Sequence, residues 1–248
     1  MKGFIMQNRH TKTNFTFNSF LMQRKDFLKK GLPGVLSIIG ISAIIGHGDK
    51  ETVDDDCTVS PRETKGPFPN KTPAQLVQSN IKGDRTGIAL LINLTIQDKN
   101  NDCKPIPGAI VDIWHCDKDG YYSEYGNHPM QHKDLTGEHF LRGRQTADDK
   151  GRVSFLSIYP GWYSGRAPHI HLEIFNSNGK SLLITQVAFP ESVSKTVYNS
   201  PLYANRGDAD TSNTRDGIFR DSLSDQLAAV TGNLKDGFTM TKTIVVKG

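Results

Sequence analysis

Two histidines separated by one residue are the clearest candidate for chemistry in this sequence. His169 and His171 would project to one face of a β-strand, because successive side chains on a strand alternate between faces. Neutral imidazole is a common metal ligand, so the pair can share one ion. Tyr163 precedes the pair by six residues and Arg166 by three. The His-x-His pattern alone does not favour two metal ligands over two structural histidines. Its neighbours raise the case for a metal site, because they add a phenol and a guanidinium.

Short β-rich runs separated by turn residues must position these side chains. One run ends in Trp114-His-Cys-Asp-Lys-Asp-Gly-Tyr-Tyr-Ser123, which could bring a tyrosine to the histidine pair. The predicted strands are residues 88–97, 109–114, 152–158, 169–175, 182–189 and 238–246. Strands with this punctuation predict an all-β sandwich with long loops and little helix.

Two later segments have weaker patterns. Residues 191–221 form a long polar connection, with one helical turn predicted near residues 192–198. Residues 224–230 fit a short helix or a strand equally well.

Several segments resemble those of a known family and occur in the same order as in that family. They are Pro107-Gly-Ala-Ile-Val-Asp-Ile-Trp-His115, Gly120-Tyr-Tyr-Ser123, Phe140-Leu-Arg-Gly143, Pro160-Gly-Trp-Tyr163 and Arg166-Ala-Pro-His-Ile-His171. Together they resemble the intradiol ring-cleavage dioxygenases, the family of protocatechuate 3,4-dioxygenase and catechol 1,2-dioxygenase, over residues 57–246. The resemblance implies a mononuclear non-haem Fe(III) bound by Tyr122, Tyr163, His169 and His171.

The implied reaction is the opening of a catechol-type ring between its two hydroxyl-bearing carbons by O2, to a cis,cis-muconate-type diacid. By the resemblance, Tyr163 is the ligand that leaves the metal and takes up a substrate proton. Arg166 matches the arginine that stabilises charge on the substrate ring, and Gln186 the glutamine near the substrate. Phenol titrates near pH 10, so only a strongly Lewis-acidic ion holds two phenolates at neutral pH, and hard oxygens favour Fe(III).

A further segment, Ser60-Pro-Arg-Glu-Thr-Lys-Gly-Pro-Phe-Pro69, resembles the mouth of the active site in protocatechuate dioxygenases. It implies that Thr64, Gly66 and Phe68 bind substrate. Phe68 replaces a tyrosine of that family, which removes a hydroxyl contact.

Two other functions stay open at this point. A β-sandwich binding module, similar to prealbumin-like domains, could carry His-x-His incidentally, and the same scaffold could hold Zn or Cu. Both alternatives leave the two tyrosines without a role. The other histidines of residues 57–248, and the remaining tyrosines and tryptophans, are expected to be hydrogen-bonded, solvated or packing residues. A homo-oligomer is compatible with the family.

The positive charge of the chain is concentrated near its beginning. The 248 residues carry 30 Lys and Arg against 26 Asp and Glu, a net charge of +4. Residues 1–48 hold seven of the basic residues and one acid, so the remaining 200 residues have a net charge of −2. The composition is that of a folded chain, and no basic stripe is present that nucleic acid would require.

From Met22, a basic stretch precedes an apolar run at residues 32–46, which is the layout of an export signal. The run is short for a membrane span. Residues 24–29 also resemble a twin-arginine signal, with Lys25 in place of one arginine. We therefore expect residues 1–48 to direct export, with Met22 as a candidate start. The mature domain, residues 49–248, would be periplasmic or extracellular and free of the membrane. An uncleaved anchor or a buried helix is the alternative.

Three cysteines allow one bridge. Cys57 and Cys103 flank the first predicted strand and could form a disulfide in an exported protein, while Cys116 would stay reduced.

Overall fold

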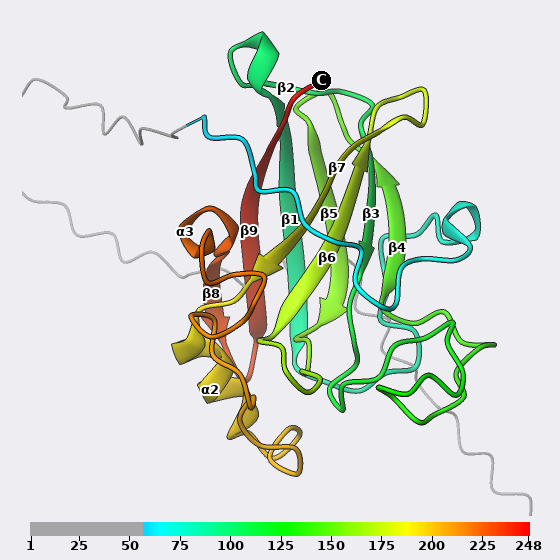
Figure 1. The fold of residues 1–248 in the computed structure, drawn as a ribbon, viewed down its shortest axis with the longest axis vertical. Helices are drawn as coiled ribbons and strands as arrows, with labels where there is room; N and C mark the ends of the chain where they lie inside the picture. Colours follow the sequence, from blue (N-terminus) through cyan, green and yellow to red (C-terminus); the bar gives the residue numbers. More distant parts are fainter. Residues whose placement is uncertain (1–56) are drawn as a thin grey trace, which may run out of the picture. The chain divides into compact units, whose positions relative to one another are not determined.

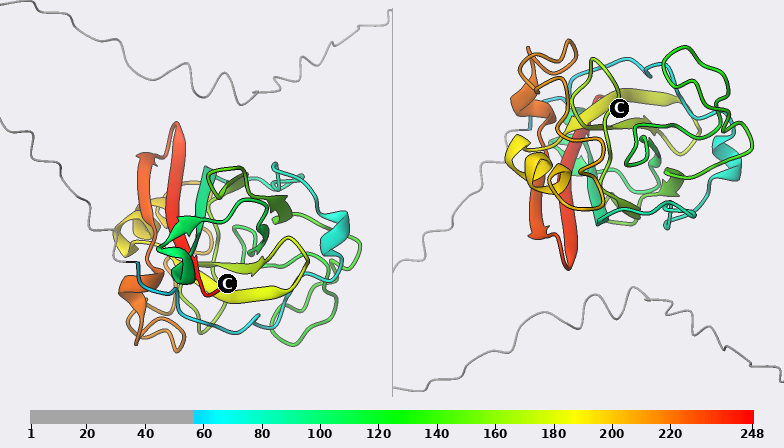
Figure 2. Two further views of the ribbon diagram at one scale, coloured as in Figure 1. Left: turned by 90° about the horizontal axis from the view of Figure 1, so that it is seen from above. Right: turned by 90° about the horizontal axis from the view of Figure 1, so that it is seen from below.

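Residues 57–248 fold into two packed β-sheets, whose strands run upright in Figure 1 and are seen from above and from below in Figure 2. The structure is a computed structural model that describes residues 57–248, so the predicted export signal lies outside the described residues. One sheet has the order β4-β3-β6-β7. The other has the order β2-β1-β9-β8, with β5 also paired to β1. The strands are β1 (Ala89–Asp98), β2 (Lys104–Pro105), β3 (Ile110–Trp114), β4 (Arg142–Thr146), β5 (Arg152–Ile158), β6 (His169–Phe175), β7 (Ser181–Ala188), β8 (Ala229–Asn233) and β9 (Gly237–Val246).

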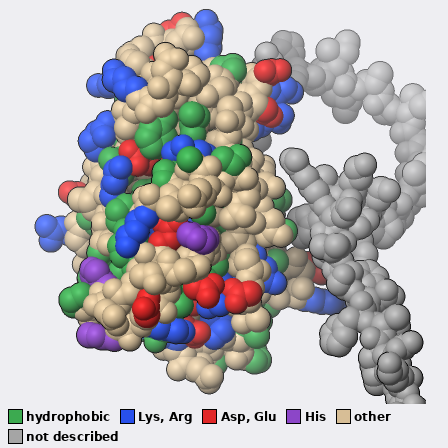
Figure 3. Space-filling model, turned by 90° about the vertical axis from the view of Figure 1, so that its right-hand side faces the viewer, with side chains coloured by type: hydrophobic (Ala, Val, Ile, Leu, Met, Phe, Trp, Pro, Cys, Tyr) green, Lys and Arg blue, Asp and Glu red, His purple; other side chains and the backbone are tan. Residues whose placement is uncertain are grey.

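Within residues 57–248, helix is confined to short pieces, as predicted. They are η1 (Pro73–Gln75), η2 (Lys99–Asn101), α2 (Glu191–Tyr198) and α3 (Leu223–Gln226). None of the helices in the described part of the chain is long and apolar enough to span a bilayer. Figure 3 shows acidic and basic side chains interspersed on one face of the molecule.

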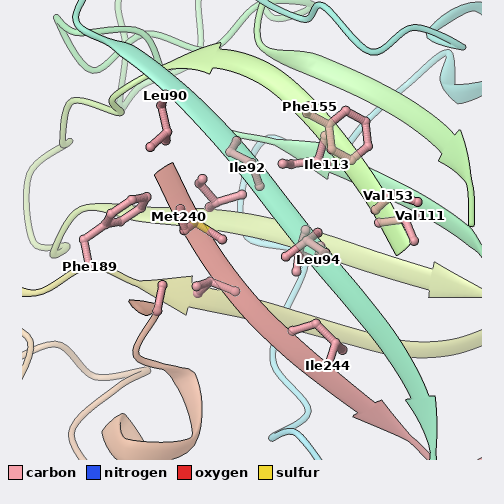
Figure 4. Packing of buried hydrophobic residues seen from close by; sticks show 14 of the residues in the cluster. Leu90, Ile92, Leu94, Val111, Ile113, Val153, Phe155, Phe189, Met240 and Ile244 are labelled. Atoms are coloured by element: carbon pink, nitrogen blue, oxygen red, sulfur yellow. The ribbon is translucent and has the colours of Figure 1, made fainter. Parts of the chain in front are cut away.

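The core lies between the two sheets (Figure 4). In β1 every second residue is buried, because Leu90, Ile92 and Leu94 face the other sheet. Strand β6 differs, since six of its seven residues are buried. Its apolar residues enter the core, while His169, His171 and Glu173 lie on the opposite face. Something must therefore cover the outer face of β6.

The cover is residues 57–72, here called the strap. Figure 1 shows it in cyan, crossing the sheet that contains β6 and β7. The backbone of Glu63 donates to Ile184 of β7 at 2.8 Å. Lys65 pairs with the buried Glu173 of β6 at 2.7 Å. A disulfide between Cys57 and Cys103 ties one end of the strap to the β1–β2 corner, and Cys116 is a buried free thiol, as expected from the sequence.

All six predicted strands are present, within two residues of their expected bounds. The sequence pattern did not indicate β4, whose residues are Arg-Gly-Arg-Gln-Thr, or the short polar edge strand β8. The undecided segment at residues 224–230 divides between α3 and β8. The predicted helical turn near residues 192–198 is α2, and the rest of the long connection, residues 199–221, packs beside the candidate site described next.

Candidate metal centre

The two histidines lie at the start of β6 with their Nε2 atoms 3.1 Å apart. Ile170 between them is buried in the core, so both imidazoles share the opposite face, as predicted. His169 Nδ1 lies 2.6 Å from the carbonyl oxygen of Ala167. A carbonyl can only accept, so this nitrogen carries the proton and Nε2 keeps a free lone pair. Burial lowers the pKa of both imidazoles, which keeps them neutral and able to bind a cation.

Tyr122 and Tyr163 lie beside the histidine pair. The Tyr163 ring centre is 5.4 Å from that of His169, the Tyr122 ring centre is 6.3 Å from that of His171, and the two phenol rings are 5.7 Å apart. The four side chains predicted as ligands are therefore gathered in one place.

The Tyr122 hydroxyl is buried without a hydrogen-bond partner, and so is Nδ1 of His171. Unpaired buried polar atoms are costly, so each calls for an explanation. Burial raises the pKa of Tyr122, and also that of Tyr163, where the neighbouring Arg166 charge opposes the effect. Within residues 57–248, no three His, Cys, Asp or Glu side chains form a metal site, so an ion at the histidine pair would need the phenol oxygens. The residues present fit a hard, highly charged cation.

Two glycines let the tyrosine-bearing loops meet. A Cβ on Gly120, which has a φ of +88°, would stand 2.3 Å from the carbonyl oxygen of Trp162. A Cβ on Gly161 would stand 2.5 Å from the carbonyl oxygen of Asp117, to which the Gly161 amide donates at 3.1 Å. Backbone approach this close is open only to glycine. The two glycines therefore bring Tyr122 and Tyr163 together from separate loops.

The Tyr122 loop is held from two further sides. The Gln131 side chain accepts from the Tyr122 amide at 2.9 Å and donates to the Tyr122 carbonyl at 3.0 Å. The Phe68 ring stacks on the phenol at a centroid distance of 4.6 Å. Arg142 of β4, fully buried, donates to the Ser123 carbonyl at 2.6 Å and to the Phe68 carbonyl at 2.9 Å. A charged side chain in the interior thus connects the strap to this loop.

Arg166 lies against a tyrosine and a histidine of the candidate ligand set. Its Nη1 donates to the Tyr163 hydroxyl at 3.2 Å and lies 3.4 Å from Nε2 of His169. Its Nη2 donates to Oε1 of Gln186 at 2.6 Å. Its Nε donates to both carboxylate oxygens of Asp216, at 3.1 and 2.9 Å. The guanidinium is therefore held on several sides beside the candidate ligands.

Strand register places Gln186. It lies opposite His171 in the antiparallel β6–β7 pair, so its side chain shares the face of the histidines. Its Nε2 donates to the carbonyl of Thr64 at 3.0 Å, which joins the strap to Arg166 through one amide. Trp114 is the partner of His171 in the β3–β6 pair, and its ring stacks parallel on the imidazole at 5.1 Å.

The three strap residues predicted to bind substrate all lie at this site. Besides the Thr64 contact, Gly66 packs against the His171 ring. Phe68 is only 1% exposed, because it is enclosed by Tyr122, Tyr125, His128 and Tyr163. In this structure Phe68 is an aromatic support for Tyr122.

Two histidines outside the candidate ligand set, His115 and His139, are hydrogen-bonded, as predicted. His115 is buried between Ser157 Oγ, 2.7 Å from its Nε2, and the Cys116 carbonyl, 2.8 Å from its Nδ1. Its burial lowers its pKa to about 4. His139 Nδ1 contacts the Glu124 carboxylate at 3.0 Å. The other residues considered and set aside are also packing or hydrogen-bonded groups, including Trp162, Tyr198 and Tyr203.

Sequence reasoning missed Asp216 and Phe219, which the 199–221 segment brings to the site. Asp216 binds Arg166, and the Phe219 ring centre is 6.2 Å from that of His169. Both residues sit in a polar stretch without hydrophobic periodicity. No local pattern distinguishes this aspartate from its exposed neighbours.

Comparison with known proteins agrees with this geometry. The family model described as Dioxygenase matches residues 65–204. Chlorocatechol 1,2-dioxygenase of Rhodococcus opacus is 30% identical over an alignment of 128 residues, and the match covers 44% of this chain and 46% of that protein. The protocatechuate 3,4-dioxygenase beta chain of Burkholderia cepacia is 30% identical over an alignment of 116 residues, and the match covers 44% of this chain and 47% of that one. The chain thus spans about half the length of these curated relatives.

A solved structure matches over a longer span. An intradiol ring-cleavage dioxygenase from Tetranychus urticae is 33% identical with a TM-score of 0.69, and the match covers 77% of this chain and 95% of that one. The family model matches more than half of the chain, and the solved structure shares the sandwich that gathers the tyrosines and histidines. This chain therefore belongs to the intradiol ring-cleavage dioxygenase family.

Proposed function

We propose that this protein is a ferric dioxygenase that opens a catechol-type ring between its two hydroxyl-bearing carbons, with O2, to a cis,cis-muconate-type diacid. Family membership supports the general class, an oxidoreductase acting on catecholic compounds. One observation carries the finer proposal. Two imidazoles with Nε2 atoms 3.1 Å apart face two tyrosines, and the hydroxyl of one tyrosine is buried without a partner.

Tyr122, Tyr163, His169 and His171 would hold the iron. When bound, Fe(III) supplies a Lewis acid that binds the catechol oxygens and activates the ring toward O2. The choice of Fe(III) over softer or less charged ions rests on the phenol oxygens, which are hard donors when ionised. A non-catalytic binding module has no use for a buried, unpaired Tyr122 hydroxyl, so this alternative has less support.

The chain's own residues divide the remaining work. Tyr163 Oη is the predicted acceptor of a substrate proton, and burial favours its protonated form by raising its pKa. Arg166 donates to this same oxygen and is held by its other contacts in a part-buried position, which suits it to stabilise negative charge on a ring. Gln186 and the strap lie beside Arg166 and enclose the site.

Two measurements test the proposal directly. The iron-loaded protein should be red-brown, because tyrosinate-to-Fe(III) charge transfer absorbs visible light. It should also consume O2 and form ring-opened products with at least one of catechol, protocatechuate and hydroxyquinol. A colourless protein with full iron content would contradict the ferric tyrosinate site. Failure to open any catechol of a broad panel would contradict the reaction.

We also propose export, which the disulfide supports. Bridges persist in oxidising compartments and are rare in the cytosol, and Cys57 and Cys103 are bridged. Fractionation of cells that express the natural gene should place the protein outside the cytoplasm. Recovery in the cytoplasmic fraction alone would contradict export.

A further inference from the structure

We infer that Asp216 is the positioning residue of this site: its carboxylate sets the direction in which the Arg166 guanidinium points at Tyr163 and His169. This inference rests on the function proposed above. Asp216 is fully buried and pairs with Arg166 at 2.9 Å. It lies 50 residues further along the chain, in the segment 199–221.

One carboxylate holds both the side chain and the backbone at this point. Asp216 Oδ2 accepts from the amide of Ala167 at 2.7 Å, and Oδ1 accepts from the amide of Ile218 at 2.8 Å. Ala167 directly follows Arg166, so Asp216 anchors the residue at its backbone and at its Nε. Phe219 adds a ring whose centre is 5.6 Å from the Arg166 Cζ.

The contacts of Arg166 determine which nitrogen of its guanidinium faces the candidate ligands. Asp216 takes Nε, and Gln186 takes Nη2 at 2.6 Å. Acceptors at two edges of a planar group determine both its position and its rotation. Nη1 is then the nitrogen that faces Tyr163 and His169. Without the carboxylate, Gln186 and the Tyr163 hydroxyl would remain as side-chain acceptors among these contacts, and Nε would lose its partner.

Asp216 also balances the charge of Arg166. The arginine side chain is 15% exposed and the aspartate side chain 0%, so the pair is largely shielded from water. A part-buried guanidinium without a counter-ion is unfavourable, and it would move toward solvent if it could. The aspartate therefore keeps the positive charge at the site.

A purely structural role, holding the 199–221 segment in place, is the competing explanation. Asp210 provides the matched control, because it belongs to the same segment and attaches it to the same turn. Its carboxylate accepts from Ser164 Oγ at 2.8 Å and from the Gly165 amide at 3.1 Å, and it is exposed. Neither contact involves Arg166.

The experiment is a double-mutant cycle on the iron-loaded protein. Asp216→Asn should lower kcat/KM by about 10- to 100-fold at unchanged iron content, since loss of a supporting contact at a metal site has effects of this size. Asp210→Asn should change kcat/KM by less than about 2-fold, because contacts between exposed groups contribute little. In the Arg166→Gln background, Asp216→Asn should have almost no further effect, because residues that act through each other are not additive.

Two outcomes of the cycle would overturn the inference. Asp216→Asn could lower kcat/KM by the same factor whether or not Arg166 is present, which would make its role structural. Alternatively, Asp216→Asn could retain full activity. Either result is clear without knowing the natural substrate, because one catechol that is turned over is enough.

A measurement on the unaltered chain covers the case in which the variant does not fold. In protein loaded with diamagnetic Ga(III), hydrogen exchange of the Arg166 Nε–H should be at least about 10-fold slower than that of Arg152. Arg152 Nε also donates to a carboxylate, that of Asp148, but is exposed. Equal exchange rates would show that the pair does not hold the guanidinium and would overturn the inference. This measurement needs no turnover. If the protein opened no catechol, the proposed function would be contradicted, and the exchange rates would still test the inference about Asp216.

Discussion

Gly66 of the strap lies so close to His171 that a Cβ on Gly66 would stand 2.8 Å from the Cε1 atom of the imidazole. The glycine also has a φ of +66°, in the left-handed region. The strap thus limits the movement of one candidate metal ligand by backbone contact. This relationship leads to the first prediction.

Gly66→Ala should reduce iron occupancy and activity, because the methyl group displaces His171. The left-handed φ adds about 1–3 kcal/mol of strain. Gly108→Ala is the matched control: φ there is +75°, but the nearest atom to a Cβ is 3.9 Å away, on Ser177. Iron content by metal analysis and unfolding by urea separate the two effects. If both variants bound iron equally well, contact with His171 would not matter for the ligand set.

His171→Ala should lose iron, whereas Tyr163→Phe should keep it, shift the visible band and slow turnover. The reason is that Tyr163 is the predicted ligand that leaves the metal, while Nε2 of His171 converges with that of His169. His139→Ala serves as the control and should retain iron, because the His139 imidazole contacts Glu124, which is not one of the four predicted ligands. A His171→Ala protein with full iron and activity would refute the assigned ligands.

Phe68→Ala should destabilise the protein by about 3–5 kcal/mol, the usual cost of removing a buried phenyl ring. It should also broaden or shift the visible band, because the Phe68 ring stacks on Tyr122 at 4.6 Å. Leu202→Ala, at a side chain that is 50% exposed, should change stability by less than about 0.5 kcal/mol. Urea unfolding of the three proteins measures the difference. A Phe68→Ala protein with an unchanged band would show that Tyr122 is held without the ring.

Acidification should destabilise the metal-free protein through His115. Burial lowers the pKa of His115 to about 4 in the folded state, against an unfolded value near 6.5, so the unfolded chain binds the proton more readily. The stabilisation is therefore complete above the unfolded pKa and is lost as the pH falls from about 6.5 to about 4, by about 3 kcal/mol.

Urea unfolding at several pH values measures this dependence, and His115→Gln should make it less steep. His169 and His171 contribute in the same direction in the metal-free protein, because burial lowers their pKa values as well. Both histidines are present in the unaltered protein and in His115→Gln, so their contributions to the pH dependence cancel in the comparison. An equal pH slope in the two proteins would exclude His115 as a contributor.

Replacing Cys57 and Cys103 by serine should lower the free energy of unfolding by about 2–4 kcal/mol, since the bridge closes a loop with a sequence separation of 46 residues. The intact mature protein should titrate with one free thiol per unfolded, unreduced chain, that of Cys116. Three thiols would show that the bridge does not form.

Much of the fold could be predicted from the sequence because strong strands carry their own signal. Residues 92–97 alternate between apolar and polar side chains, and the turns after this strand contain Gly, Asn, Asp and Pro. Strand β4 gave no such signal, because its buried side chain is that of Arg142. The Arg142 guanidinium donates to the carbonyls of Phe68 and Ser123, which lie in two other loops. Its burial depends on partners far away in sequence.

The site was predictable to the same extent. The four predicted ligands, Arg166 and Gln186 stand in local motifs on strands and at strand ends, and the structure brings them together. Asp216 has no motif, since its role depends on where the polar connection at residues 191–221 places one carboxylate. The stacking of Trp114 on His171 follows from the register of β3 against β6, which becomes known only once the sheet is formed.

The parallel pairing of β1 with β9 has a consequence for biosynthesis. Leu90 is opposite Phe238 and Asp98 opposite Val246, so the first long strand shares a ladder with the last of the described strands. During synthesis β1 can pair with β5 on one side, but its other edge stays open until β9 has been made. An open apolar strand edge is a point of aggregation. A nascent chain of this protein therefore exposes that edge while residues 99–236 are made, and chaperone binding at this stage would protect it.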